Sequence, residues 1–210
     1  MNSLFDFFLE TYQNTSTTFI LLEVVAFFFG IASVWYAKKE NILVYPTGLV
    51  ATIITVFLLY KAEYFGDMMM NFYYSVMSIY GWWNWSRTKN DTSYLPISRT
   101  NFKEKWVGFL LFVLTMIVTY AVYWYFGNEI KIENYIDIFT SGVFFTAMWY
   151  MATKKLENWT LWIIADIITI PLYAYRGLGM LSLQYLIFTI LAIQGYIAWK
   201  KSLDKNPSTL

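Results

Sequence analysis

Cysteine and histidine are both absent from the 210 residues of this chain, and charged residues make up only 14% of it. Without cysteine the chain forms no disulfide and offers no thiolate to a metal ion. Without histidine it lacks the side chain most often used as a general base and as a zinc ligand. An enzyme built on this sequence would depend on carboxylates, hydroxyl groups and lysine alone, which argues against a zinc enzyme and a histidine-activated nucleophile.

Apolar residues, by contrast, are in large excess. They make up 58% of the chain, and aromatic residues alone make up 22%. A soluble domain of this size cannot bury so much apolar surface, and stretches long enough to cross about 30 Å of hydrocarbon as helices recur along the chain. We therefore predict an all-α membrane protein, a single membrane domain over residues 1–210 with seven transmembrane helices at 19–37, 42–60, 68–86, 106–126, 136–152, 158–175 and 181–199.

The basic residues predict how the chain sits in the membrane. Twelve of the 15 Lys and Arg residues follow the first, third, fifth and seventh predicted spans, and only Lys61, Lys131 and Arg176 lie on the other side. Because Lys and Arg in short loops stay in the cytoplasm, the amino terminus is predicted outside and the carboxyl terminus in the cytoplasm. No basic cluster lies on a soluble stretch, so no nucleic-acid partner is expected.

The last third of the chain matches the first third. IYGWWNWSR (79–87) aligns with IQGYIAWKK (193–201), so residue 79 falls on residue 193, a shift of 114, and ATIIT (51–55) falls on ADIIT (165–169) at the same shift. The basic loops AKKEN and TKKLEN instead match at a shift of 116, because Lys38 falls on Lys154. This difference predicts a two-residue insertion in one copy.

The matched segments predict two parallel three-helix repeats, at 19–86 and 136–199, joined by a linker helix at 106–126. Duplicated membrane bundles of this 3+1+3 kind recur among transporters that bind substrate between their halves. The repeat therefore favours transport over the two other classes that we consider, an intramembrane enzyme and a channel.

Two acidic residues lie deep within predicted spans. Glu23 is in the first span and Asp166 is in the middle of the sixth, and no Lys or Arg lies within a span to pair with either of them. A charge at the centre of a membrane span costs about 2.5–3.5 kcal/mol on insertion scales, so each of these acids is expected to have a specific role. Glu23 has a second interpretation, as a protonated residue that makes a structural hydrogen bond.

The sixth span carries a polar and aromatic stripe. Residues at intervals of three or four share one face of a helix, and this face holds Trp159, Trp162, Asp166, Thr169 and Tyr173. Indole faces attract cations by about 0.5–2 kcal/mol, and a nearby carboxylate adds to that attraction. The stripe therefore suits an organic cation.

A second stripe on the third span includes Asn71, Tyr74 and Ser78. If the two stripes face each other, they form a slot for a substrate. Aromatic residues near span ends also have a simpler interpretation, as belts at the membrane interface; it applies to Trp85, Trp199, Trp106 and Tyr64.

With these motifs the chain resembles the PnuC family of vitamin transporters. The resemblance rests on Glu23, on the GL of PTGLV, on SIYGWWNWSR at 78–87 and on the segment from 157 to 199 that begins ENWTLW. It implies a bacterial inner-membrane protein, a homotrimer that lets a vitamin equilibrate across the membrane by facilitated diffusion. It also implies that a cytoplasmic kinase traps the vitamin by phosphorylation. We expect no cofactor and no metal.

The resemblance implies nicotinamide riboside as the substrate, with thiamine as the alternative, since close relatives carry thiamine. Trp162 agrees with the nicotinamide riboside carriers, whereas Asn71, Ser78 and Asp166 stand where those carriers usually have Gln, Asn and Asn. Both vitamins are aromatic cations, so the stripe suits either. The predicted substrate-binding residues are Trp162, Asp166, Asn71, Ser78, Glu23, Tyr74, Trp159, Thr169 and Tyr173.

Overall fold

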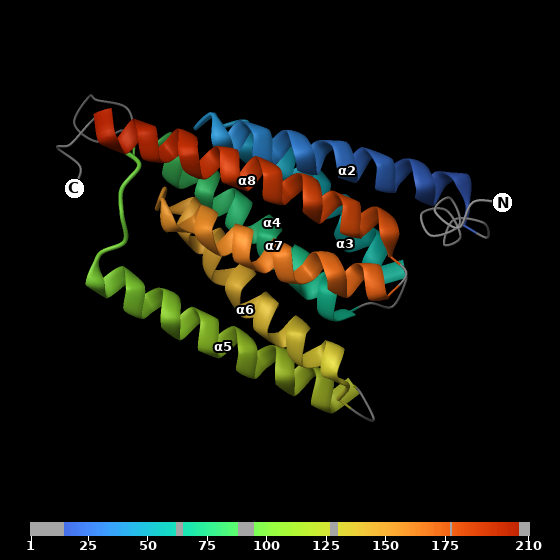
Figure 1. Ribbon diagram of the computed structural model, residues 1–210. Helices are drawn as coiled ribbons and strands as arrows, with labels where there is room; N and C mark the ends of the chain where they lie inside the picture. The colour runs from blue at the N-terminus through green and yellow to red at the C-terminus, as the bar shows by residue number, and fades with distance from the viewer. Residues whose placement is uncertain (1–14, 62–64, 88–94, 127–129, 177, 206–210) are drawn as a thin grey trace.

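The computed structural model describes residues 15–61, 65–87, 95–126, 130–176 and 178–205. Within these residues the chain forms seven α-helices, and the only β-type pairing is an isolated bridge between Ser98 and Lys155 (Figure 1). The helices are α2 (Thr17–Lys38), α3 (Val44–Lys61), α4 (Phe65–Ser86), α5 (Phe102–Phe126), α6 (Ile132–Ala152), α7 (Glu157–Tyr175) and α8 (Gly179–Lys205). Each predicted span falls on one of them, so the prediction of an all-α protein is confirmed.

Four of these helices, α2, α3, α5 and α8, are long and apolar enough to cross a membrane. Large apolar side chains cover their outer faces; Phe28 on α2 is 63% exposed and Leu110 on α5 is 61% exposed. Such surfaces suit hydrocarbon better than water. The other three helices, α4, α6 and α7, carry most of the buried polar side chains of the described residues.

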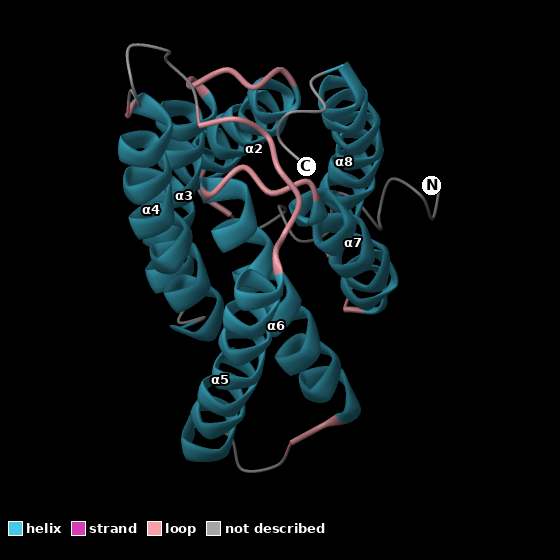
Figure 2. Cartoon of the chain, turned by 90° about the vertical axis from the view of Figure 1, so that its left-hand side faces the viewer, coloured by secondary structure: helices cyan, strands magenta, loops and turns pink. Residues whose placement is uncertain are grey.

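Six of the described helices pack in a closed ring, in the order α2, α3, α4, α6, α7, α8 and back to α2. The seventh, α5, packs along α6 outside this ring and barely touches α4. Figure 1 shows α5 at the edge opposite α2, and Figure 2 shows it running beside α6. The ring is therefore closed by two contacts between helices distant in sequence, α2 with α8 and α4 with α6.

The helices α2, α4, α6 and α8 finish at the same end of the ring. Near this end Lys38 on α2 donates to Gln194 on α8 at 2.9 Å, and Asn84 on α4 donates to the carbonyl of Ala152 on α6 at 2.9 Å. We call this the basic end, because most of the Lys and Arg residues among the described residues lie at or just beyond the ends of these helices. At the opposite end, the Arg176 guanidinium lies 2.6 Å from the Asp137 carboxylate.

The turn after α2 and the turn after α6 have the same backbone shape. Glu40 and Lys154 both have a positive φ, 54° and 53°. Their amides donate to Ala37 and Met151 respectively, each at 3.0 Å. Because residues 40 and 154 are also related by a shift of 114, the register continues through the turns. The predicted two-residue insertion is therefore wrong: the lysines simply occupy different positions of the same turn.

Two pairs of aromatic rings close the basic end. The ring centroids of Tyr45 and Trp85 are 5.1 Å apart, those of Trp159 and Trp199 are 5.4 Å apart, and both pairs meet edge to face at 88°. Trp85 and Trp199 lie 6.1 Å from each other and join the pairs into one cluster. Edge-to-face pairs stabilise by about 0.5–1.5 kcal/mol beyond their buried area.

This cluster needs two glycines. A Cβ on Gly195 would lie 2.6 Å from the ring of Trp159, and a Cβ on Gly81 would overlap the ring of Tyr45. Any larger residue would therefore push the rings away from their helices.

The interpretation of the aromatic residues as interfacial belts is wrong for Trp85 and Trp199, which are only 6% and 0% exposed. Trp106 on α5 is 53% exposed and agrees with a belt. Tyr64 lies outside the described residues. Burial of both indoles shows that the matched tryptophans hold the bundle together.

Candidate functional site

The polar face of α7 points into the ring. Asp166 is 1% exposed and Thr169 is 3% exposed, and the interior also holds the indole nitrogen of Trp162. Oδ1 of Asp166, Oγ1 of Thr169 and Nε1 of Trp162 have no hydrogen-bond partner among the described residues. Buried polar atoms are nearly always paired in folded proteins. Three unpaired atoms on one helical face therefore mark a place where a ligand or water completes the structure.

Of these three groups, the Asp166 carboxyl has the highest free-energy cost of burial without a partner. No ion pair among the described residues involves it. A carboxylate removed from water is costly unless it is protonated or meets a positive charge. The described residues also contain no group of three or more acidic residues placed to hold a metal ion.

Aromatic rings surround the indole of Trp162. Tyr74 on α4 lies 6.1 Å from it and Phe144 on α6 lies 5.4 Å from it, between ring centroids. The helices α4 and α7 are not neighbours in the ring, so Tyr74 and Trp162 meet across its interior. The two predicted stripes therefore do come together, at the level of these two residues.

The rings of Trp162, Tyr74 and Phe144 form an aromatic wall, and two further rings extend it. Tyr185 on α8 stacks on Tyr173 at 5.3 Å and lies 5.9 Å from Phe144. Neither Tyr185 nor Phe144 is among the residues predicted from the sequence. The shift of 114 could have indicated Tyr185, because it corresponds to Asn71; Phe144 corresponds to Gly30, so nothing in the first copy pointed to it.

The remaining predicted residues lie around this wall or away from it. Asn71 on α4 and Glu23 on α2 are half-buried. Ser78 is 4% exposed and its hydroxyl faces α3, since a Cβ on Gly48 would lie 3.8 Å from its Oγ. Trp159 belongs to the aromatic cluster at the basic end, although its Nε1 is buried without a partner.

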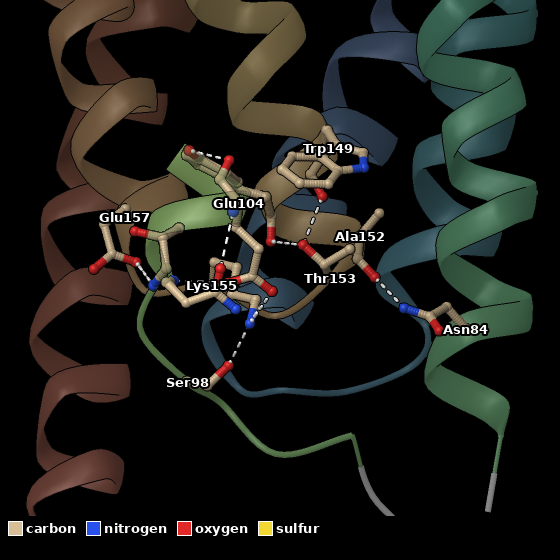
Figure 3. A network of polar contacts seen from close by, with 11 residues as sticks. Asn84, Ser98, Glu104, Trp149, Ala152, Thr153, Lys155 and Glu157 are labelled. Atoms are coloured by element: carbon tan, nitrogen blue, oxygen red, sulfur yellow. Dashed lines mark hydrogen bonds and ion pairs between the residues drawn. The ribbon is translucent and has the colours of Figure 1, made fainter. Parts of the chain in front are cut away.

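A polar network at the basic end ties the segment before α5 to the turn after α6 (Figure 3). Ser98 and Leu156 share a backbone hydrogen bond of 2.9 Å, and the Lys155 amine lies 2.9 Å from the Ser98 hydroxyl and 2.7 Å from Glu104. The Thr100 amide donates to the Glu157 carboxylate at 3.0 Å. The ring helices fall into two groups of consecutive helices, α2–α4 and α6–α8. These contacts fix α5 to the second group.

A ring of helices with an apolar outer surface and unpaired polar atoms inside is the architecture of a polytopic membrane carrier. A model of the nicotinamide mononucleotide transporter family matches residues 20–201 of this chain. The chain therefore belongs to this transporter family, the family of the PnuC proteins.

Individual relatives agree with that assignment. The nicotinamide riboside transporter PnuC of Escherichia coli K12 is 24% identical over 89% of this chain and 88% of its own length. The nicotinamide riboside transporter PnuC of Neisseria mucosa is 26% identical over 88% of this chain and 74% of its own length. A crystal structure of the vitamin B3 transporter PnuC shares the fold, with a TM-score of 0.71 at 22% identity over 94% of this chain and 86% of that one.

Proposed function

We propose that this protein takes up nicotinamide riboside across the bacterial inner membrane by facilitated diffusion. The family and the names of the relatives from Escherichia coli and Neisseria mucosa support this substrate. No nucleotide-hydrolysing motif occurs in the chain, so the free energy for accumulation must come from elsewhere. The resemblance to the family implies that a cytoplasmic kinase provides it by phosphorylating the imported vitamin.

The observation that carries the proposal is the unpaired Oδ1 of Asp166 beside the aromatic wall. A pyridinium ring placed against Trp162 would bring a positive charge to that carboxylate, while the indole face attracts the same charge. Sugar hydroxyls would then pair with Thr169 and the Trp162 N–H, and the Asn71 amide would offer a further polar contact. The ligand would complete the buried atoms of Asp166, Thr169 and Trp162 that the described residues leave unpaired.

Thiamine is the second candidate, and the same carboxylate supports it. Its thiazolium ring is also an aromatic cation, so Asp166 and Trp162 would attract it in the same way. The two vitamins differ in the groups around the charged ring: nicotinamide riboside carries a ribose and a carboxamide, and thiamine carries a pyrimidine. Competition between the two vitamins for uptake decides which one is the substrate.

The proposed architecture is that of two parallel repeats, 19–86 and 136–199, around the linker 106–126. Two hydrogen bonds support it: Trp85 Nε1 donates to the carbonyl of Met151 at 3.3 Å, and Trp199 Nε1 donates to that of Ala37 at 3.0 Å. Each donor is shifted by 114 from the other donor, and each acceptor by 114 from the other acceptor. Such exchanged bonds are what a two-fold axis between parallel halves produces.

The proposed orientation places the basic end in the cytoplasm and the amino terminus outside, because most Lys and Arg residues follow α2, α4, α6 and α8. All seven helices would then span the membrane, α4, α6 and α7 among them although they are less apolar. The homotrimer implied by the resemblance belongs to the same proposal. Cross-linking in native membranes would test it.

Uptake of labelled nicotinamide riboside into proteoliposomes tests the function, with unlabelled nicotinamide riboside, thiamine and riboflavin as competitors and no ion gradient. We expect saturable uptake that nicotinamide riboside abolishes. Uptake of labelled thiamine alone would contradict the first substrate and support the second. Chemical conversion of the vitamin by purified protein would support an enzyme, and ion conductance without saturable uptake would support a channel.

A further inference from the structure

The turns after α2 and α6 meet at the basic end through an ion pair. The Lys154 Nζ lies 3.6 Å from the Glu40 carboxylate. The Lys154 side chain is only 2% exposed and its amine lies 4.4 Å from the ring centroid of Trp85, whereas the Glu40 side chain is 34% exposed. Glu40 and Lys154 correspond to each other by the shift of 114, so the pair joins equivalent points of the two groups of ring helices.

The neighbouring contacts also cross between these groups. The indole of Trp85 on α4 is bonded to α6, and the indole of Trp199 on α8 is bonded to α2. These are the two places where the ring closes between helices distant in sequence. Separating the two groups at the basic end lengthens these bonds and parts Glu40 from Lys154.

Buried polar atoms at the basic end are consistent with a second, open conformation of this end. The Tyr45 hydroxyl and the Trp159 Nε1 also correspond by the shift of 114, and both are buried without a partner among the described residues. Burial lowers the pKa of the Lys154 amine, and the Glu40 carboxylate partly opposes this effect. Water reaching the basic end would solvate all three groups, which offsets part of the cost of breaking the ion pair.

We propose that the ion pair between Glu40 and Lys154 is a latch that holds the basic end closed, and that it separates when the carrier opens its interior at that end. Lys154 then exchanges a carboxylate and an indole face for water, and Glu40 needs little movement because it already contacts solvent. The latch concerns opening alone, and it does not depend on which vitamin is carried.

A single introduced thiol tests the latch, since the chain has no cysteine of its own. Thr169→Cys places it on the face of α7 that points into the ring, about three helical turns from Trp159, at a position that is 3% exposed. The reaction rate with a membrane-impermeant maleimide is measured in right-side-out and inside-out vesicles, and Asp204→Cys at the exposed end of α8 identifies the vesicles that present the basic end. This readout needs no substrate, so its failure leaves the proposed function intact.

Glu40→Gln and Lys154→Met are each expected to speed labelling of the thiol at least about tenfold, equivalent to a shift of about 1.4 kcal/mol in the opening equilibrium. The increase should occur only in vesicles that present the basic end. The exchange Glu40→Lys with Lys154→Glu should bring labelling back below the rate of either single variant, since both positions have the same backbone conformation. The rescue is partial, because a carboxylate at position 154 loses the attraction of the Trp85 ring face.

Lys155→Met is the matched control, because this neighbouring lysine pairs with Glu104 and Ser98 and does not join the two groups of helices. It should leave the labelling rate unchanged. Labelling of Glu40→Gln at the background rate in protein that elutes as a single folded species would overturn the latch. Equally fast labelling of the exchanged protein and the single variants would also overturn it, because it would show that the pairing itself is not what closes the end.

Discussion

The helices α3 and α7 correspond by the shift of 114, yet matched polar side chains are hydrogen-bonded on α3 and unpaired on α7. On α3 the Thr52 hydroxyl accepts a hydrogen bond from Ser75 at 2.8 Å, and Thr55 donates to a carbonyl one turn earlier at 2.8 Å. The corresponding residues on α7 are Asp166 and Thr169, and both carry a buried oxygen without a partner. At these two positions α3 needs no ligand to complete its hydrogen bonds, whereas α7 does.

The two helices also differ at the position of the aromatic ring that lines the interior. Gly48 on α3 corresponds to Trp162 on α7, and a Cβ at Gly48 would already lie 2.8 Å from the Ser33 hydroxyl. The first group of ring helices thus packs tightly where the second presents an indole. Both groups make matching contacts at the basic end, so the two groups differ in the interior and agree at this end.

The largest expected effect comes from removing the charge of Asp166. We expect Asp166→Asn to lower uptake of the cationic vitamin about 100-fold, because loss of one member of a buried charge pair costs about 2–5 kcal/mol. Uptake into proteoliposomes measures it. Thr52→Val at the corresponding position of α3 and Asp204→Asn on the exposed end of α8 should stay within about twofold, and wild-type uptake by Asp166→Asn would show that its charge plays no part.

Gly81 and Gly195 test the packing at the basic end, where the two groups of helices agree. We expect Gly195→Ala and Gly81→Ala each to destabilise the protein by about 1–3 kcal/mol, since the added methyl must displace the ring of Trp159 or Tyr45. Thermal unfolding in detergent gives the size of each loss. A loss at only one of the two positions would contradict equivalent packing.

The indole of Trp162 comes next. Trp162→Phe keeps a ring but removes the N–H and weakens the attraction for a cation, so binding should weaken about three- to tenfold. Ligand-induced stabilisation of the purified protein measures the change. Trp106→Phe on the exposed face of α5 serves as the control, and equal effects of the two changes would argue against a cation near Trp162.

The smallest effect is expected at Thr169. Thr169→Val should weaken binding about two- to fivefold, because a neutral hydrogen bond contributes about 0.5–1.5 kcal/mol. Thr55→Val removes a hydroxyl that is already bonded within its own helix and should leave affinity unchanged. Titration of both variants with the same labelled vitamin compares them, and equal losses would mean that the hydroxyls act through helix stability.

Much of the candidate site could be proposed from spacing alone. The intervals between Trp162, Asp166 and Thr169 fix them on one face of a helix, and the structure buries that face. Phe144 could not be predicted, because its role depends on α6 lying between α4 and α7 in the ring. Trp159 shares the spacing of the stripe but lies one turn nearer the basic end, where it packs on Trp199.

The sequence by itself determined the helical class, the approximate helix bounds and the matching of the two groups of helices. These properties follow from local composition and periodicity, which act within one helix and need no knowledge of its neighbours. Only the tertiary structure decided the closed order of the ring, the position of α5 outside it and the pairing of Glu40 with Lys154. Such contacts depend on how helices distant in sequence pack together, and no pattern within a single helix specifies its partner.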